Sequence, residues 1–76
     1  MNKERKKRFQ DVIALLEEAK DELVDIQSEE IDAFDSLPEG LQISDRGDKM
    51  QEWIDFIDDA MGKIDNVICY IEKEVK

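Results

Sequence analysis

The sequence predicts an all-α fold on three observations. Charged residues make up 42% of the 76 residues, against three glycines and one proline, a composition that disfavours loop-rich and all-β proteins. Apolar residues recur at alternating spacings of three and four, which is typical of helices packed along a seam. The proline lies near the middle of the chain, where it can separate two such segments. We therefore expect residues 1–76 to form one domain, an antiparallel two-helix hairpin.

The first helix is expected from about residue 3 to residue 36, and its start overlaps a basic arm at residues 1–8. Its seam follows a three-four alternation that only Glu30 interrupts: Phe9, Val12, Leu16, Ala19, Leu23, Ile26, Ala33 and Leu37. Other apolar residues lie beside this seam: Ile13, Leu15, Val24, Ile31 and Phe34. The apolar stripe is wider than a two-stranded coil needs, so we expect the helix to contact more than one neighbour.

A reversal of the chain is expected at residues 37–45. Pro38 disfavours helix in the residue before it, and Gly40 permits a left-handed turn. Ser44 or Asp45 is placed to cap the second helix. The side chains expected to close the turn as an apolar plug are Leu37, Leu41 and Ile43.

The second helix is expected from about residue 46 to residue 75. Its seam is unbroken and comprises Met50, Ile54, Ile57, Met61, Ile64, Ile68, Ile71 and Val75. A flanking row at spacing seven widens the stripe and comprises Trp53, Ala60 and Val67. Each helix is then roughly 45–50 Å long at 1.5 Å per residue, and each has an apolar face wide enough for two neighbours.

Two helices cover only one side of each stripe, so we expect two hairpins to pair about a twofold axis as a homodimeric four-helix bundle. The length of the chain points the same way, because so short a chain seldom buries enough apolar surface to be more than marginally stable. The residues expected in the core or the dimer interface are Leu16, Leu23, Ile26, Trp53, Ile54, Ile57, Met61, Ile64 and Ile68.

The net charge of −10 is distributed unevenly. Residues 1–8 hold five basic residues and one acidic residue, whereas residues 9–62 hold 17 acidic residues and three basic ones. Acidic side chains along the outer sides of the helices could imitate a phosphate backbone and bind a basic surface of a host protein. The expected partner surface comprises Asp11, Glu18, Glu22, Asp25, Asp32, Asp55 and Asp59. The alternative is that these acids only keep the bundle soluble, and direct nucleic-acid binding is disfavoured.

A second contact surface is expected at Phe56, Lys63 and Tyr70, which recur at spacing seven and project away from the seam. Extra packing within a four-helix bundle explains the same row equally well. Cys69 stands alone, so no internal disulfide is possible. We interpret it as a surface thiol of a cytoplasmic protein, in a reducing compartment.

Several enzyme classes and the membrane proteins are disfavoured. The chain has no histidine, the usual general base and zinc ligand, and no apolar stretch approaches the ~20 residues of a membrane span. A magnesium-dependent all-α nucleotide pyrophosphatase is a remote alternative, since pairs such as Glu18-x-x-Asp21 and Glu52-x-x-Asp55 are present. These acids are expected opposite the seam, so we expect no catalytic residue, no metal site and no cofactor.

The segment FDSLPEGLQ at residues 34–42, followed by SDRGDKM at residues 44–50 and by repeated Ile-Asp pairs, resembles small helical proteins encoded in phage and prophage genomes. The resemblance implies a phage-type accessory or counter-defence protein, and it assigns no activity to any residue. With the charge pattern, it leads to the hypothesis of a small acidic, non-enzymatic protein that binds and inhibits a host protein. The alternative is an assembly module whose apolar stripe packs on a partner helix.

Overall fold

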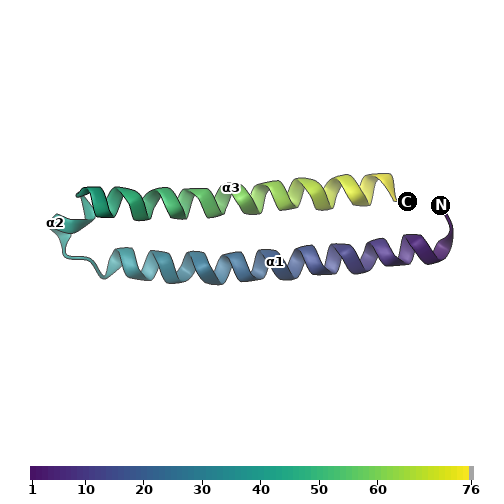
Figure 1. The fold of residues 1–76 in the computed structure, drawn as a ribbon, viewed down its shortest axis with the longest axis horizontal. Helices are drawn as coiled ribbons and strands as arrows, with labels where there is room; N and C mark the ends of the chain where they lie inside the picture. The colour runs from purple at the N-terminus through teal and green to yellow at the C-terminus, as the bar shows by residue number, and fades with distance from the viewer. Residues whose placement is uncertain (76) are drawn as a thin grey trace.

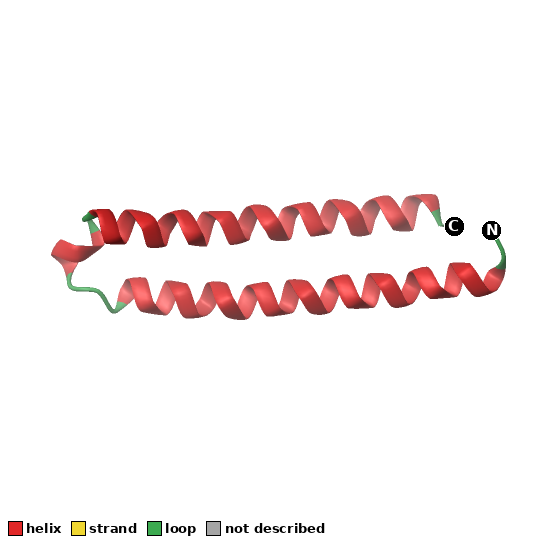
Figure 2. Cartoon of the chain, in the orientation of Figure 1, coloured by secondary structure: helices red, strands yellow, loops and turns green. Residues whose placement is uncertain are grey.

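The computed structural model describes residues 1–75 and consists of helices and short connections, without a strand in that range (Figure 2). In chain order the helices are α1 (Lys3–Asp35), α2 (Glu39–Gln42) and α3 (Asp45–Glu74). The prediction of an all-α fold with two long helices is confirmed. The single turn α2 lies inside the segment that the sequence predicts as a non-helical reversal.

The two long helices lie side by side and run in opposite directions, so both ends of the chain lie at the same end of the molecule (Figure 1). The helix pair measures 59 × 16 × 11 Å, so it is one layer thick along its shortest axis. Its radius of gyration is 17.4 Å, against about 11 Å for a compact domain of this length. An elongated pair of this kind leaves most side chains near the surface.

The seam of α3 is the predicted one. Ile54, Ile57 and Ile68 are buried against α1, and they are the only apolar side chains of residues 1–75 that reach this degree of burial. The remaining seam residues of α3 are half-buried, as is Val75 just beyond its end: Met50, Met61, Ile64 and Ile71. The seam is therefore continuous along α3 but buries little apolar surface.

The seam of α1 is rotated relative to the prediction. The half-buried residues form two rows, one of which comprises Lys6, Ile13, Lys20, Gln27 and Phe34 and the other Phe9, Leu16, Leu23 and Glu30, with Leu37 just beyond the end of α1. The predicted seam shares the second row but replaces the first by Val12, Ala19, Ile26 and Ala33, which are exposed. The prediction is wrong because it follows apolar residues alone, whereas Lys20 and Gln27 enter the seam by bonding to polar groups of α3.

The glycine that the turn requires is not the predicted one. Gly40 lies within α2, and no residue of the described chain has a positive φ. The glycine that the turn requires is Gly47, where an added Cβ would lie 2.0 Å from the carbonyl oxygen of Gln42. The side-chain Nε2 of Gln42 donates to the carbonyl oxygens of Phe34 (3.2 Å) and Leu37 (3.3 Å), which closes the end of α1. The Gln42 segment thus links the two long helices.

Two further expectations for the turn hold only in part: Ser44 is the N-cap residue of α3, and Leu37 is half-buried. Ser44 precedes α3 but makes no side-chain cap; its Oγ donates instead to the carbonyl oxygen of Leu41 at 2.5 Å. Asp45 is the first residue of α3. Of the expected apolar plug, Leu37 is half-buried while Leu41 and Ile43 are exposed. Polar and backbone contacts, rather than an apolar plug, hold this end together.

Candidate functional site

The contacts between α1 and α3 divide the surface of the helix pair into two faces. Lys20 and Gln27 of α1 contact Asp65 and Asp58 of α3. Residues four positions further along a helix lie on the same flank, so Val24 lies on this side too. We call it the polar face, and it comprises Glu17, Asp21, Val24, Ile31, Asp55, Asp58, Asp65 and Glu72.

A lysine in the seam is held by carboxylates of the polar face. The Nζ of Lys20 donates to Oδ1 of Asp65 and lies 3.9 Å from a carboxylate oxygen of Glu17. The hydrogen bond to Asp65 raises the pKa of Lys20 above its usual value of 10.5, against partial desolvation, and the negative charges of Asp65, Glu17 and Asp21 add to the rise. Lys20 therefore stays protonated, and its charge is offset where the two helices meet.

A glutamine makes the second cross-link on this face. The Nε2 of Gln27 donates to the backbone oxygen of Ile54 at 3.1 Å and to Oδ1 of Asp58 at 2.7 Å. Together with the Lys20–Asp65 pair, this contact fixes the register of the helices. The two residue numbers of each pair add to 85, so residues of α1 and α3 whose numbers add to about 85 lie level with one another.

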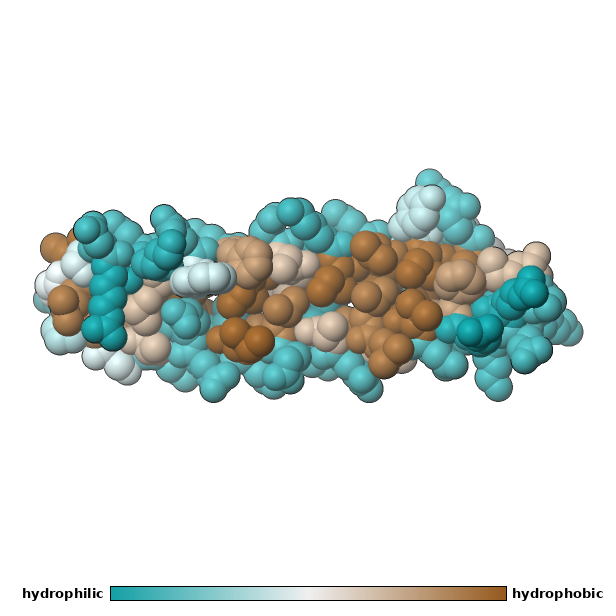
Figure 3. Space-filling view, viewed as in Figure 1, coloured by the Kyte–Doolittle hydropathy of each residue, from teal (hydrophilic) through white to brown (hydrophobic). Residues whose placement is uncertain are grey.

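The opposite side of the helix pair is apolar. We call it the apolar face, and it comprises Val12, Leu15, Ala19, Ile26 and Ala33 of α1 with Trp53, Phe56, Ala60, Val67 and Tyr70 of α3. Figure 3 views this side and shows apolar side chains in a band that runs along both helices. Trp53 is 51% exposed and Phe56 is 57% exposed. Their rings meet edge to face at a centroid distance of 5.6 Å, so two large aromatic side chains remain open to solvent.

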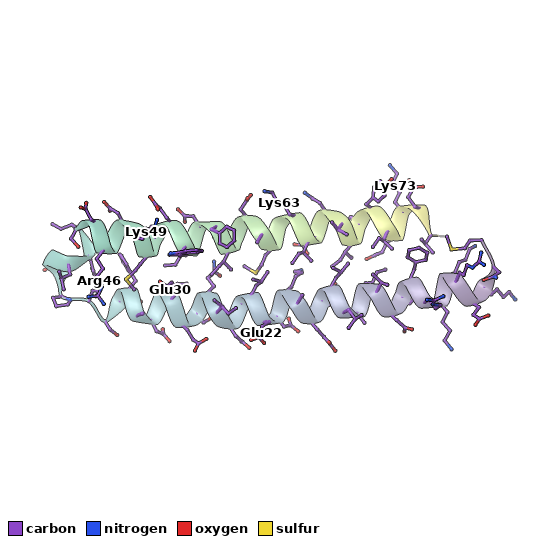
Figure 4. All side chains as sticks on the ribbon, viewed as in Figure 1. Glu22, Glu30, Arg46, Lys49, Lys63 and Lys73 are labelled. Atoms are coloured by element: carbon purple, nitrogen blue, oxygen red, sulfur yellow. The ribbon has the colours of Figure 1, made fainter. Side chains whose placement is uncertain are left out.

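The two edges of the apolar face carry different charged residues: glutamates border it on α1, and lysines that pair with carboxylates of their own helix border it on α3. Glu22 and Glu29 follow Leu15 along α1 at spacing seven, and Lys49 and Lys63 flank Phe56 on α3 at the same spacing. Glu22 and Lys63 lie at nearly the same position along the molecule, on the two opposite edges of the apolar face (Figure 4). The Nζ of Lys63 lies 3.0 Å from a carboxylate oxygen of Asp59 on its own helix, and its side chain is exposed.

The structure separates the seven acids of the predicted partner surface. All seven are exposed, and four of them share one row on the outer edge of α1: Asp11, Glu18, Asp25 and Asp32. Asp55 and Asp59 are four residues apart on the outer side of α3, toward its polar flank, and Glu22 borders the apolar face. The acids of α1 and those of α3 therefore lie on different helices of the pair, and their joint binding of one partner stays a prediction. A single acidic row along α1 remains.

The residues predicted in the core or the dimer interface differ in their burial. Ile54, Ile57 and Ile68 are buried and Leu16, Leu23, Met61 and Ile64 are half-buried, whereas Ile26 and Trp53 are exposed on the apolar face. Phe56, Lys63 and Tyr70 form the predicted row and are exposed along one edge of that face. The sequence analysis missed that the flanking rows of the two helices join into one face. The spacing in the sequence indicates this face, since the flanking row of each helix lies three residues beyond a row of its seam.

The ends of the helix pair differ from the middle. The basic arm is helical from Lys3, and Oδ1 of Asn2 accepts the backbone N–H of Arg5 at 2.8 Å as an N-terminal cap. Near this end a groove of about 430 Å³ is lined by Met1, Arg5, Arg8, Phe9 and Val12.

In residues 1–75, no three metal-ligating side chains are grouped so that they could hold an ion.

No helix of residues 1–75 is both long and apolar enough to cross a membrane. Cys69 is exposed and makes no disulfide. In comparisons with known proteins, no family model matches the chain, and neither a curated protein nor a solved structure matches it significantly.

Proposed function

We propose that the chain is a non-catalytic interaction module, an antiparallel helical hairpin whose apolar face packs on other helices to complete a four-helix bundle. The observation that supports this most directly is the apolar face, which extends over both helices from the level of Val12 to that of Ala33 and exposes Trp53, Phe56 and Tyr70. Contiguous exposed patches of this kind mark interaction sites, and buried aromatic side chains dominate the binding energy of interfaces.

The energetics of the isolated helix pair favour the same proposal. Of the apolar side chains of residues 1–75, only those of Ile54, Ile57 and Ile68 are buried, and no described side chain is completely buried. A hydrophobic core this small seldom offsets the conformational entropy that a chain of this length loses on folding. Covering the apolar face would add the second layer that helical domains normally contain.

The experiment compares two substitutions on the same turn of α1. Ile26 lies on the apolar face and is 44% exposed, whereas Val24 lies on the polar face and is 45% exposed. Tagged wild-type chain, Ile26→Lys and Val24→Lys are purified from expressing cells and weighed by native mass spectrometry. We expect complexes heavier than the tagged monomer for the wild type and for Val24→Lys, and their loss in Ile26→Lys. Equal complexes in both variants would reject the apolar face as the binding surface.

A second function is supported by the acidic row of α1. Asp11, Glu18, Asp25 and Asp32 lie on the outer edge of the helix, away from the apolar face, and therefore stay exposed when that face is covered. Such a row attracts basic surfaces through electrostatics that salt screens. We propose that it binds a basic surface of a host protein, as a phage-type accessory protein would, by imitating nucleic-acid charge.

Charge reversal tests this second function. Asp25→Lys/Asp32→Lys is compared with Glu39→Lys/Glu72→Lys, which changes the net charge equally outside the row. Tagged protein is incubated with bacterial lysate, and bound proteins are eluted with a salt gradient or with double-stranded DNA. We expect a DNA-displaceable partner for the wild type and for the control, and none for the variant with the reversed row. Retention of the partner by that variant, or its resistance to DNA, would contradict the charge-mimic proposal.

A further inference from the structure

We propose that a second copy of this chain covers the apolar face, related by a twofold axis parallel to the helices, so that α1 of each copy lies against α3 of the other. The two turns then lie at the same end of the dimer. This inference deepens the proposed function and rests on its assignment of the apolar face. It is carried by three observations: the surface area, the sizes of the side chains that meet, and the charges on the edges.

The area available matches what a stable dimer needs. The accessible surface is 5974 Å², against about 4,800 Å² for a compact folded chain of this mass. The excess of about 1,200 Å² exceeds the ~800 Å² that each partner buries in a standard interface. A second copy is therefore large enough to restore the compactness that the single helix pair lacks.

Side-chain sizes are complementary under this symmetry. A twofold axis parallel to the helices keeps residues of α1 opposite the residues of α3 that lie level with them. The three pairs brought together across the face are Trp53 with Ala33, Ile26 with Ala60, and Val67 with Ala19. Each pair joins a large side chain to an alanine, and such alternation lets facing layers interdigitate without voids.

Charges on the edges are complementary as well. Glu22 and Lys63 lie level with each other on opposite edges of one copy (Figure 4), so the parallel axis places Glu22 of each copy beside Lys63 of the other. The exposed Lys63 side chain can turn from Asp59 of its own helix toward this second carboxylate. By the same symmetry Leu15 meets Tyr70, so the edge contact continues with an apolar pair.

The other face-to-face arrangement has its twofold axis across the helices, with the turns at opposite ends. Centred on the apolar face, it sets Glu22 against Glu22 and Lys63 against Lys63, which repel. It has one advantage, because it separates the turn halves that carry most of the negative charge. At physiological ionic strength charges more than about 8 Å apart are largely screened, so the contacts at the edge outweigh this separation.

Spin labels at the turn measure which axis is present. Gly40 has nothing within 4 Å of an added Cβ, so Gly40→Cys in a Cys69→Ser background carries a label without disturbing the fold. The parallel axis predicts a label separation below about 35 Å, because neighbouring helices of a bundle lie 8–10 Å apart. Turns at opposite ends predict a separation near the 59 Å length of the helix pair, and that result would overturn the proposed axis.

A charge-swap series tests the edge contact directly. Dimer dissociation constants are measured by sedimentation for Glu22→Lys, Lys63→Glu and the double variant Glu22→Lys/Lys63→Glu. Each single change is expected to weaken the dimer about three- to tenfold, since exposed ion pairs have modest strength and the contact occurs twice, and the double variant is expected to recover wild-type affinity. Lys73→Glu, an equal charge change away from the face, should have no effect. Additive weakening in the double variant would reject the contact.

The outcomes separate this inference from the proposed function. A purified chain that sediments as an 8.9 kDa monomer at high concentration, yet loses a heavier complex with another protein in Ile26→Lys, would overturn the second copy and leave the interaction module standing. A monomer whose Ile26→Lys and Val24→Lys variants behave alike would overturn both. A dimer that Ile26→Lys dissociates and whose turn labels lie close together supports both.

Discussion

The two faces of the helix pair are built on the same helices and differ in what the second helix contributes. Val24 on the polar face and Ile26 on the apolar face are almost equally exposed, at 45% and 44%. Around Val24, α3 contributes carboxylates such as Asp58, while around Ile26 it contributes Ala60. The exposure of one apolar side chain therefore does not mark an interface. Whether an exposed apolar side chain belongs to an interface depends on the side chains that the neighbouring helix places beside it.

The same comparison explains why α1 alone is ambiguous. Its apolar residues lie on both flanks of the seam, Val24 and Ile31 on one side and Val12 and Ile26 on the other. On α3 the corresponding flanking rows are unequal: one comprises Asp58, Asp65 and Glu72, and the other Trp53, Ala60 and Val67. Once the register between the helices is fixed, the flanking rows of α3 therefore determine which side of the helix pair is apolar.

The largest expected effect comes from breaking that register. In Gly47→Ala the new Cβ would lie 2.0 Å from the backbone oxygen of Gln42, so α3 must shift against the turn. We expect the free energy of unfolding to fall by about 3 kcal/mol or more, measured by urea unfolding followed by circular dichroism.

Gly62→Ala is the matched control for that substitution. Gly62 lies within α3, and an added Cβ there meets nothing within 4 Å. Alanine favours the helix, so the free energy of unfolding should rise by up to about 1 kcal/mol. If Gly47→Ala were as well tolerated as Gly62→Ala, the close approach to Gln42 would not hold the register.

An intermediate effect is expected from making the seam of α1 apolar throughout. Lys20→Leu/Gln27→Leu replaces the polar cross-links of the seam by leucines, and we expect the free energy of unfolding to rise by about 1–2 kcal/mol. Association should become less specific, with species larger than the wild-type complex in sedimentation, because polar seam residues restrict register and partner number.

The control for this change is Asp21→Leu/Ser28→Leu, which adds leucines one residue further along. These positions are exposed and lie outside the seam, so the stability of the helix pair should not rise. A gain equal to that of the seam variant would mean that added hydrophobicity, and not replacement of the cross-links, produces the effect.

The smallest effect is expected from Asp65→Asn at alkaline pH. The folded pKa of Lys20 is raised above 10.5 chiefly by the hydrogen bond to Asp65, so this contribution to stability is present below pH 10.5 and is lost as the pH rises through the folded pKa. The stability difference between wild type and Asp65→Asn should be constant at neutral pH and shrink in strong base. Asp59→Asn is the control, and an identical pH dependence of both variants would contradict the assignment.

The sequence predicts the fold class, both long helices and the entire seam of α3, because isoleucine and methionine recur there without a break. It does not predict the seam of α1, where Lys20 and Gln27 replace apolar residues at two positions. Their place in the seam depends on hydrogen bonds to α3, and partners so far apart in sequence cannot be read from the spacing within one helix.

The candidate surfaces were predictable to a similar degree. The row of Phe56, Lys63 and Tyr70 follows from spacing within one helix, as does the acidic row on α1. The joined apolar face and the division of the seven acids require the relative rotation of the two helices. That rotation is fixed by contacts such as Gln27 with Asp58 and by the close approach at Gly47, which are properties of the folded chain.

Trp53 reports directly on whether a second copy covers the apolar face, as we propose. It is the only tryptophan of the chain, and it is 51% exposed on that face in the single chain. Its fluorescence and its quenching by iodide are measured as the chain is diluted. We predict protected, blue-shifted emission that becomes accessible to iodide as the dimer dissociates. Emission that is fully accessible to iodide at every concentration would contradict the claim.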